Sequence, residues 1–594
     1  MSLRIIYGTA GTGKSEAIFQ EIQEKIQNHS KHPITIITPE QFSFTAEQKL
    51  LATSPSHSVI QAEVVTFARM AYRILNEVGG KTKTHLSSSG RAILIDYILL
   101  TQKERFSFLG KSDENVEMMA RQLTELKKHM VTSEKLEEVI ANTQEEYLKR
   151  KLQDITKLYE SYIEKIQSNY IDENDGLTIL ATQLEESTQF QNHDIYIDEF
   201  AGFTLQEYEI LRKLMKLSHQ MTITICTDNL EENTNPDTDI FYANKQTAKR
   251  ILEIAKQEQV IIDNPICLKD EVNKNIIPKA ENTCIKNNKR FKNPELKHLA
   301  ENSKGPFYTK YENQVENISL FLANNPYSEI EHVAIEITKL IQKGYRYEEI
   351  AVITKNIPQY ASLCRAIFRQ YQIPVFIDEK KDLSNNLLAK FILSLLEIFS
   401  QNWSYEAIFG LIKTGLYHLD EQEIAILENY CLKWGIKGSK WYAKDWNFYD
   451  ETEEEQKQIL YAKEQVVQPL LKFKKTLQGL KTVKEITSAI YYFLIENEVD
   501  KKLLEKIAQL QENGQEGNEQ EWMNSQEIQR EYETSFQILM DLLDEIVLVL
   551  GDETITFERY AKILKMGLNQ TDLGTIPATL DQVIVRRCRQ IKKP

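Results

Sequence analysis

Short apolar runs separated by amphipathic stretches recur in the first third of the chain. These runs are LRIIY (3–7), ITIITPEQ (34–41), VVTF (64–67), DIYIDEF (194–200) and MTITICTD (221–228). After the first run, Ile18, Ile22 and Ile26 are spaced four apart, which places them on one face of a helix over residues 15–29. Alternation of strands and helices predicts a parallel sheet.

The same alternation returns after residue 325. The pattern predicts a helix over 329–344, a strand at IAVITK (350–355), a second strand at IPVFIDE (373–379) and a last strand at DQVIV (581–585). The intervening stretches 87–184 and 387–550 have helical periodicity, and residues 56–235 contain no proline. We therefore predict two α/β cores, each interrupted by a mainly helical insertion.

The loop after the first strand carries a phosphate-binding motif. GTAGTGKS fits G-x-x-x-x-G-K-[ST] and lies between a predicted strand and a predicted helix, where this motif functions. The alternative is a glycine-rich turn with a chance lysine, but the flanking elements favour nucleotide binding. Lys14 is expected to reach the outer phosphates of ATP, and Ser15 to bind Mg²⁺. The expected nucleotide-binding residues are Gly8, Thr9, Ala10, Gly11, Thr12, Gly13, Lys14 and Ser15.

Two carboxylates follow the buried run at 195–197. Ligands of parallel sheets bind at the carboxyl ends of the strands, which is where Asp198 and Glu199 are expected. We predict that Asp198 joins Ser15 at the Mg²⁺ ion and that the catalytic residues are Lys14, at the outer phosphates, and Glu199, which polarises the attacking water. The alternative is a pair of acidic residues at an ordinary strand end. Binding alone does not establish hydrolysis.

This motif and the two cores predict a P-loop NTPase with two RecA-like parallel-sheet cores, as in superfamily 1 helicases. The expected first core is 1–85 with 186–268, interrupted by a helical insertion at 86–185. A basic connector at 269–310 follows. The second core is 311–386 with 551–594, interrupted by a helical insertion at 387–550.

Net charge and cysteine content indicate which partners and which cellular compartment to expect. The formal net charge is −15, so any DNA contact must use a local basic patch. Residues 269–310 hold ten Lys or Arg against five Asp or Glu, a balance of +5 that fits either a DNA contact or a solvated connector. Six scattered cysteines without a C-x-x-C pair suggest reduced thiols. No signal peptide or long apolar run is evident, so we expect a cytoplasmic protein with no membrane contact.

Several segments together resemble the AddB family, which forms the second subunit of the bacterial AddAB helicase–nuclease. They are YGTAGTGKS, ITPEQFSFTAEQKL (37–50), VVTFARMAYRILNEVGG, IDEFAGFTLQEYEIL (197–211), RFKNPELKHLAEN (290–302), YRYEEIAVITKNIPQY (345–360), YQIPVFIDEKKDL (371–383) and LENYCLKWGIKGSKW (427–441). The resemblance implies an AddA-type motor and nuclease partner, binding of double-strand DNA ends and single strands, processing of double-strand breaks for recombination, and Chi recognition.

The resemblance also implies features that this sequence does not match. The family carries a nuclease domain with an iron–sulfur cluster in its C-terminal half, and the cluster ligands are missing here. The tail RRCRQIKKP resembles a frameshift or truncation, and the motifs that read adenine and sense the γ-phosphate are not found. We therefore expect nucleotide binding with feeble or no hydrolysis.

Four functions stay open from the sequence. The first is an ATP- and DNA-binding subunit of a helicase–nuclease complex, without nuclease chemistry of its own. The second is an autonomous DNA-dependent translocase. The third is a DNA-scanning scaffold whose P-loop is vestigial, and the fourth is an inactive gene fragment.

Overall fold

The computed structural model describes residues 1–53, 60–78, 84–109, 116–172, 175–231, 235–268, 293–302, 309–379, 381–383, 386–447, 451–516, 519–573 and 581–587. Contacts divide the chain into two compact units. Unit 1 comprises residues 1–85 and 121–321, and unit 2 comprises residues 86–120 and 322–589. Each unit is built around its own parallel sheet.

In the described part of the chain, the sheet of unit 1 has seven strands, all parallel. They are β1 (Ser2–Gly8), β2 (Ile34–Ile37), β3 (Ala62–Val65), β6 (Asp194–Ile197), β7 (Gln220–Cys226), β8 (Ile261–Ile262) and β9 (Ile266–Cys267). The order is β3-β2-β6-β7-β1-β8, and β9 also pairs with β1. The predicted α/β class with a parallel-sheet core is confirmed.

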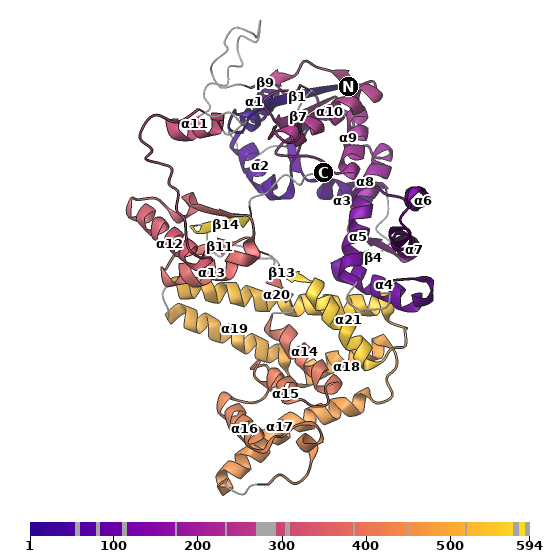
Figure 1. Cartoon of the computed structure of the whole chain (residues 1–594), viewed down its shortest axis with the longest axis vertical. Coiled ribbons are helices and arrows are strands. Elements are labelled where there is room, and N and C mark those ends of the chain that lie inside the picture. Colours follow the sequence, from indigo (N-terminus) through magenta and orange to yellow (C-terminus); the bar gives the residue numbers. More distant parts are fainter. Residues whose placement is uncertain are drawn as a thin grey trace. The chain divides into compact units, whose positions relative to one another are not determined.

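Helices cover both faces of this sheet (Figure 1). One face packs against α1 (Lys14–Gln27) and α2 (Glu40–Thr53). The other face packs against α3 (Phe67–Val78), α8 (Asp175–Gln183), α9 (Leu205–Leu217) and α10 (Tyr242–Gln257). Burial on both faces explains why the central strands are mostly apolar and why the threonines within them, such as Thr222 and Thr224, are buried as well.

A buried ionic cluster joins several of the remaining helices and strands of unit 1. Lys127 Nζ lies 3.0 Å from Asp172 and 2.8 Å from Asp175, and the Tyr162 hydroxyl donates to Asp172 at 2.7 Å. This cluster joins α5 (Val116–Lys128) to α7 (Glu146–Asn169), β5 (Tyr170–Asp172) and α8. The elements are β4 (Thr84–Leu86) and α5 (Val116–Lys128), whose residues are divided between the units, and α6 (Ser133–Asn142), α7 (Glu146–Asn169), β5 (Tyr170–Asp172), η3 (Leu184–Glu186) and α11 (Pro294–Asn302).

Unit 2 is dominated by one large helical core. Its helices are α4 (Ser88–Thr101), α14 (Leu387–Ser400), α15 (Tyr405–Ile412), α16 (Glu421–Trp434), α17 (Glu453–Leu477), α18 (Val483–Glu496), α19 (Val499–Glu516), α20 (Glu519–Leu550) and α21 (Phe557–Gln570), with the short η1 (Lys103–Arg105) and η6 (Gly438–Tyr442). Helices α19 and α20 run side by side (Figure 1). Glu545 on α20 accepts bonds from the Ser87 N–H at 2.7 Å and the Ser87 hydroxyl at 2.6 Å, which fixes the start of α4 to this core.

The second sheet lies in unit 2 and has three parallel strands among the residues that the structure describes. They are β10 (Ala351–Thr354), β11 (Val375–Ile377) and β14 (Val583–Arg587), in the order β10-β14-β11. The helices α12 (Pro326–Gln342) and α13 (Ile357–Gln370) pack on one face. Nearby are η4 (Tyr347–Glu349) and the antiparallel pair β12 (Lys381–Asp382) and β13 (Asp572–Leu573). Of the predicted basic connector, 269–292 and 303–308 lie outside the described residues.

Candidate nucleotide-binding site

The loop between β1 and α1 has a backbone that requires glycine. Gly11 and Gly13 have φ angles of 83° and 86°, in the left-handed region that disfavours other residues. A Cβ atom on Gly8 would lie 2.5 Å from the Leu268 carbonyl oxygen and 2.4 Å from Thr12 Oγ1. The three glycines therefore let the loop curl tightly against the end of β9.

The lysine of the motif folds over this loop. Lys14 Nζ donates to the carbonyl oxygens of Gly8 and Thr9, both at 3.0 Å. Lys14 is also the first residue of α1, whose leading N–H groups have no partner within the helix and carry its positive potential. An ammonium group and a helix N-terminus at one glycine-rich loop fit the phosphate groups of a nucleotide.

Ser15 meets one of the two predicted carboxylates. The Ser15 hydroxyl donates to Glu199 Oε1 at 3.1 Å, across 184 positions of sequence. In the sheet, β7 separates β6 from β1, and the registers Ile197↔Ile223 and Gly8↔Cys226 bring the carboxyl ends of all three strands to one edge. The sheet thus joins the loop and the end of β6 at one site.

Glu199 is held in an unusual backbone conformation. Its φ is 65°, in the left-handed region, while its side chain is exposed at the sheet edge. An L residue with a Cβ atom is disfavoured there by about 1–2 kcal/mol. Such strained residues cluster at active sites and ligand-binding sites.

Asp198 has a different set of contacts from Glu199. It is buried, with 4% of its surface exposed, and its Oδ1 accepts a 2.5 Å hydrogen bond from Thr224 Oγ1 on β7. The Asp198 N–H donates to the Ile37 carbonyl at 3.1 Å, which continues the pairing of β6 with β2. The structure brings Ser15 to Glu199 and Asp198 to Thr224, so the Mg²⁺ role of Asp198 stays a prediction.

Two residues of this site were not anticipated from the sequence. Thr224 anchors Asp198, and the Leu268 carbonyl closes the space over Gly8. The sequence pattern could have indicated Thr224. Thr222 and Thr224 alternate with apolar residues in the run MTITIC, so both are expected on the same face of the strand. No local pattern marks Leu268, since its role depends only on the pairing of β9 with β1.

An ion-paired lysine lies at the carboxyl end of β7, the strand between β6 and β1. Asp228, which follows β7, lies 3.0 Å from Lys245 Nζ, and Asp239 lies 2.8 Å from the same atom. Burial by itself lowers the pKa of Lys245, but the hydrogen bonds to Asp239 and Asp228 outweigh it and raise the pKa. Asp228 also accepts from the Asn229 N–H at 2.9 Å, as a turn residue does.

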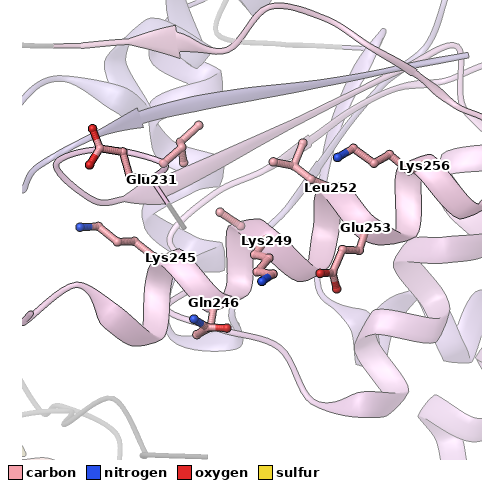
Figure 2. A pocket seen from close by; sticks show the side chains of 9 residues that line it. Glu231, Lys245, Gln246, Lys249, Leu252, Glu253 and Lys256 are labelled. Carbon is pink, nitrogen blue, oxygen red and sulfur yellow. The ribbon is translucent and has the colours of Figure 1, made fainter. Parts of the chain in front are cut away.

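A shallow hollow beside this ion pair is too small for a nucleotide. Figure 2 shows Lys245, Lys249 and Lys256 along α10, with Glu231 on the loop opposite. The hollow holds about 40 Å³, whereas ligand pockets hold about 300–1,000 Å³. Among the described residues, no group of three or more His, Cys, Asp or Glu could hold a metal ion, and no helix is both long and apolar enough to span a bilayer.

Comparison with known proteins connects this site to a family. A family model described as ADDB, N-terminal, matches residues 5–300, which include nearly all of the sheet of unit 1 and its phosphate-binding loop. Proteins named as the B component of an ATP-dependent helicase/deoxyribonuclease match nearly all of the chain. The chain belongs to the AddB family.

Three such AddB relatives show the extent of the match. The protein of Thermoanaerobacter sp. (strain X514) is 35% identical over 608 residues, covering 100% of this chain and 51% of its own length. Those of Clostridium botulinum (strain Hall) and Acetivibrio thermocellus are each 36% identical, over 603 and 602 residues, covering 98% of this chain and 50% of their own lengths. The chain therefore spans about half the length of these relatives.

Proposed function

We propose that the chain binds ATP and DNA as part of the AddB component of a helicase–deoxyribonuclease complex. That complex would process double-strand DNA breaks for recombination with an AddA-type partner, and would recognise Chi. The observation that carries the proposal is the phosphate-binding loop of β1 and α1, joined to β6 by the Ser15–Glu199 hydrogen bond. The two parallel sheets are then RecA-like cores, the first holding the nucleotide.

The roles of individual residues follow from their places at the sheet edge. Residues 8–15 would hold the phosphates, with Lys14 at the outer ones. Ser15 and Asp198 would hold Mg²⁺, whose charge neutralises the phosphate oxygens. Glu199 would orient and polarise water. Because Glu199 is exposed and Asp198 is buried, Glu199 is the carboxylate with access to solvent.

A DNA contact at the same edge is supported by the loop that follows β2. Thr38 and Pro39 lead from β2, at the carboxyl edge of the sheet, into α2, on which Phe44 is 67% exposed. Exposed aromatic rings stack on the bases of single-stranded nucleic acid regardless of sequence. Single-stranded DNA is therefore the form that we propose to lie here.

The direct test is Mg²⁺-ATP binding by the Lys14→Ala variant. Loss of the ammonium group should weaken the binding of a fluorescent ATP analogue at least about tenfold, because a charge-assisted contact is worth about 1.5–3 kcal/mol. Lys31→Ala, at an exposed site outside the loop, is the matched control and should bind as the unmodified chain does. Equal affinity of Lys14→Ala and the unmodified chain would support a scaffold with a vestigial loop.

Turnover then separates a dependent subunit from a motor. We expect the purified chain to bind ATP and hydrolyse it slowly, with or without DNA. Phosphate release measured with single-stranded DNA present would decide the matter. DNA-stimulated turnover that is lost in Lys14→Ala would make this chain an autonomous translocase.

A further inference from the structure

The segment that leads from the end of α16 toward α17 carries lysines without acidic partners. Residues 429–444 hold four lysines and no Asp or Glu, in a chain with a formal net charge of −15. The first of these lysines, Lys433, is paired with Glu451 at 2.9 Å. The other three are exposed, and no carboxylate of the described residues forms an ion pair with Lys437, Lys440 or Lys444. Their positive charge is therefore available to a ligand.

An exposed aromatic ring lies among these lysines. Tyr442 is the last residue of η6 and is 38% exposed, whereas Trp441, beside it in sequence, is buried. Lys474 on α17 places its Nζ 5.2 Å from the centre of the Tyr442 ring, a distance typical of a cation–π contact. Lys440 and Lys444 each lie two positions from Tyr442 in sequence. Lysines of two elements thus flank the ring.

The backbone next to Tyr442 is held in a strained conformation. Trp403, just after α14, has a φ of 58°, a left-handed value that is rare for a bulky side chain. Its carbonyl accepts the Gly438 N–H at 3.0 Å, and its ring meets that of Tyr442 edge to face, with the ring centres 5.4 Å apart. Strain of this kind clusters at ligand-binding sites. Here the strained residue fixes the position of η6 and of its exposed tyrosine.

Lysines around an exposed ring suit a single strand of nucleic acid. Lysines bind backbone phosphates with release of counterions, and exposed aromatic rings stack on unpaired bases. In a duplex the bases are already paired and stacked on one another, so the ring of Tyr442 would have no base to stack on. An acidic protein surface would pair with the lysines but would leave the exposed ring without a role.

We propose that Tyr442, Lys437, Lys440, Lys444 and Lys474 form a binding surface for single-stranded DNA, called here the Tyr442 patch. The patch lies in unit 2, whereas the phosphate-binding loop lies in unit 1. The proposal rests on the DNA binding proposed above, but it does not depend on ATP binding at the loop.

Salt-dependent binding of a fluorescent oligothymidylate tests the charges of the patch. Lys437→Ala, Lys440→Ala and Lys444→Ala are combined in one variant of the full chain. Binding should weaken, and the slope of log K against log salt should fall by up to about 2, since each lost phosphate contact removes about 0.7. The matched control replaces three lysines of unit 2 that are paired with carboxylates and should keep the full slope, namely Lys339, Lys501 and Lys565.

Two substitutions of Tyr442 test stacking separately from charge. Tyr442→Leu keeps an apolar contact with Trp403 but removes the aromatic face. It should weaken binding about fivefold or more at every salt concentration, with the slope unchanged. Tyr442→Phe keeps the ring and should bind as the unmodified chain does. The melting temperature of each variant shows whether it is folded.

The outcomes separate this proposal from the proposed function. If the unmodified chain binds the strand and the triple lysine variant behaves as its control does, the Tyr442 patch is not a DNA site and the proposed function stands. If the unmodified chain binds no single strand at all, the DNA part of the proposed function fails as well. A larger loss of binding with duplex than with single-stranded DNA would overturn the assignment to a single strand, in favour of a duplex contact.

Discussion

At the scale of single residues, Glu199 combines strain with a functional contact. It adopts a left-handed φ of 65° and accepts the Ser15 hydroxyl bond at the phosphate-binding loop. Glycine adopts this conformation without the Cβ penalty that other residues incur. A glutamate at this position lowers the stability of the fold relative to glycine, so a role in the chemistry of the site explains its presence better than a structural role does.

Glu199→Gly should therefore separate stability from activity. We expect the free energy of unfolding to stay the same or rise by about 1 kcal/mol, because the Cβ clash is relieved. Any ATP hydrolysis should fall to the level of Lys14→Ala. Urea unfolding followed by circular dichroism and a phosphate-release assay measure the two effects.

An ordinary helical position supplies the control for Glu199→Gly. Glu253→Gly, at an exposed site inside α10, should lower stability by about 1 kcal/mol, the usual cost of glycine in a helix. If Glu199→Gly destabilises the chain as much as this control does, the strain argument fails.

The sequence predicted the loop of this site but not its tertiary contacts. Residues 8–15 follow one another, so their spacing is enough to specify a curled loop before a helix. The Ser15–Glu199 and Thr224–Asp198 bonds depend on which strands are neighbours, and no local pattern contains that information. The partners of Asp198 and Glu199 therefore come from the structure alone, and the division of roles between these two carboxylates stays a prediction.

At the scale of secondary-structure elements, Asp194 joins three parts of the first sheet. This buried residue begins β6, and its carboxylate lies 2.8 Å from Lys25 Nζ on α1 and 2.8 Å from His219 Nδ1 beside β7. Burial by itself raises the pKa of Asp194, but the bonds from Lys25 and His219 outweigh burial and lower the pKa. A lowered pKa means that the ionised form stabilises the fold above about pH 4, and that this stabilisation is lost as the pH falls through the folded-state pKa.

Asp194→Asn should thus show a pH-dependent loss of stability. At pH 7 the variant should lose about 1–3 kcal/mol, since charge-assisted bonds are replaced by weaker ones. The difference from the unmodified chain should shrink as the pH falls below about 4, because the unfolded chain then takes up a proton at Asp194 while the folded chain, with its lowered pKa, does so only at lower pH. Urea unfolding across this pH range measures the effect, with the exposed Asp237→Asn as control. A gap that stays constant with pH would show that packing, not charge, is lost.

Strands were easier to predict than the grouping of helices. Each predicted apolar run contains a strand, because short apolar runs between turn residues are typical of strands in a buried sheet. Part of the segment predicted as the insertion 86–185 belongs to each unit. Residues 86–120, which include α4, belong to unit 2, and the residues after 120 belong to unit 1. Periodicity shows that a helix has an apolar face, but it does not show which core that face joins.

At the scale of the whole molecule, charge is distributed unevenly along the chain. The total is −15, yet residues 269–310 have a balance of +5, and much of that segment lies outside the described residues. A negatively charged protein that binds DNA needs a local cationic region to release counterions from the phosphates. The basic connector meets this need by its sequence, as the Tyr442 patch does in unit 2.

Four substitutions in the connector test this directly. Replacement of Lys286, Lys289, Arg290 and Lys292 by alanine should weaken binding to single-stranded DNA and flatten its salt dependence. Each lost phosphate contact removes about 0.7 from the slope of log K against log salt, so the slope should fall by up to about 3. The control replaces four exposed lysines of unit 2 with alanine, namely Lys339, Lys472, Lys501 and Lys565.

The two variants carry the same change in net charge, so their comparison separates a local contact from the field of the whole protein. A slope reduced only by the connector substitutions places phosphates at that segment. Equal reductions would assign the effect to net charge, and an unchanged slope in both would leave the connector as a linker. In that last case the DNA contact would have to lie at the Tyr442 patch or at the carboxyl edge of the first sheet, where Phe44 is exposed and affinity would depend on stacking more than on salt.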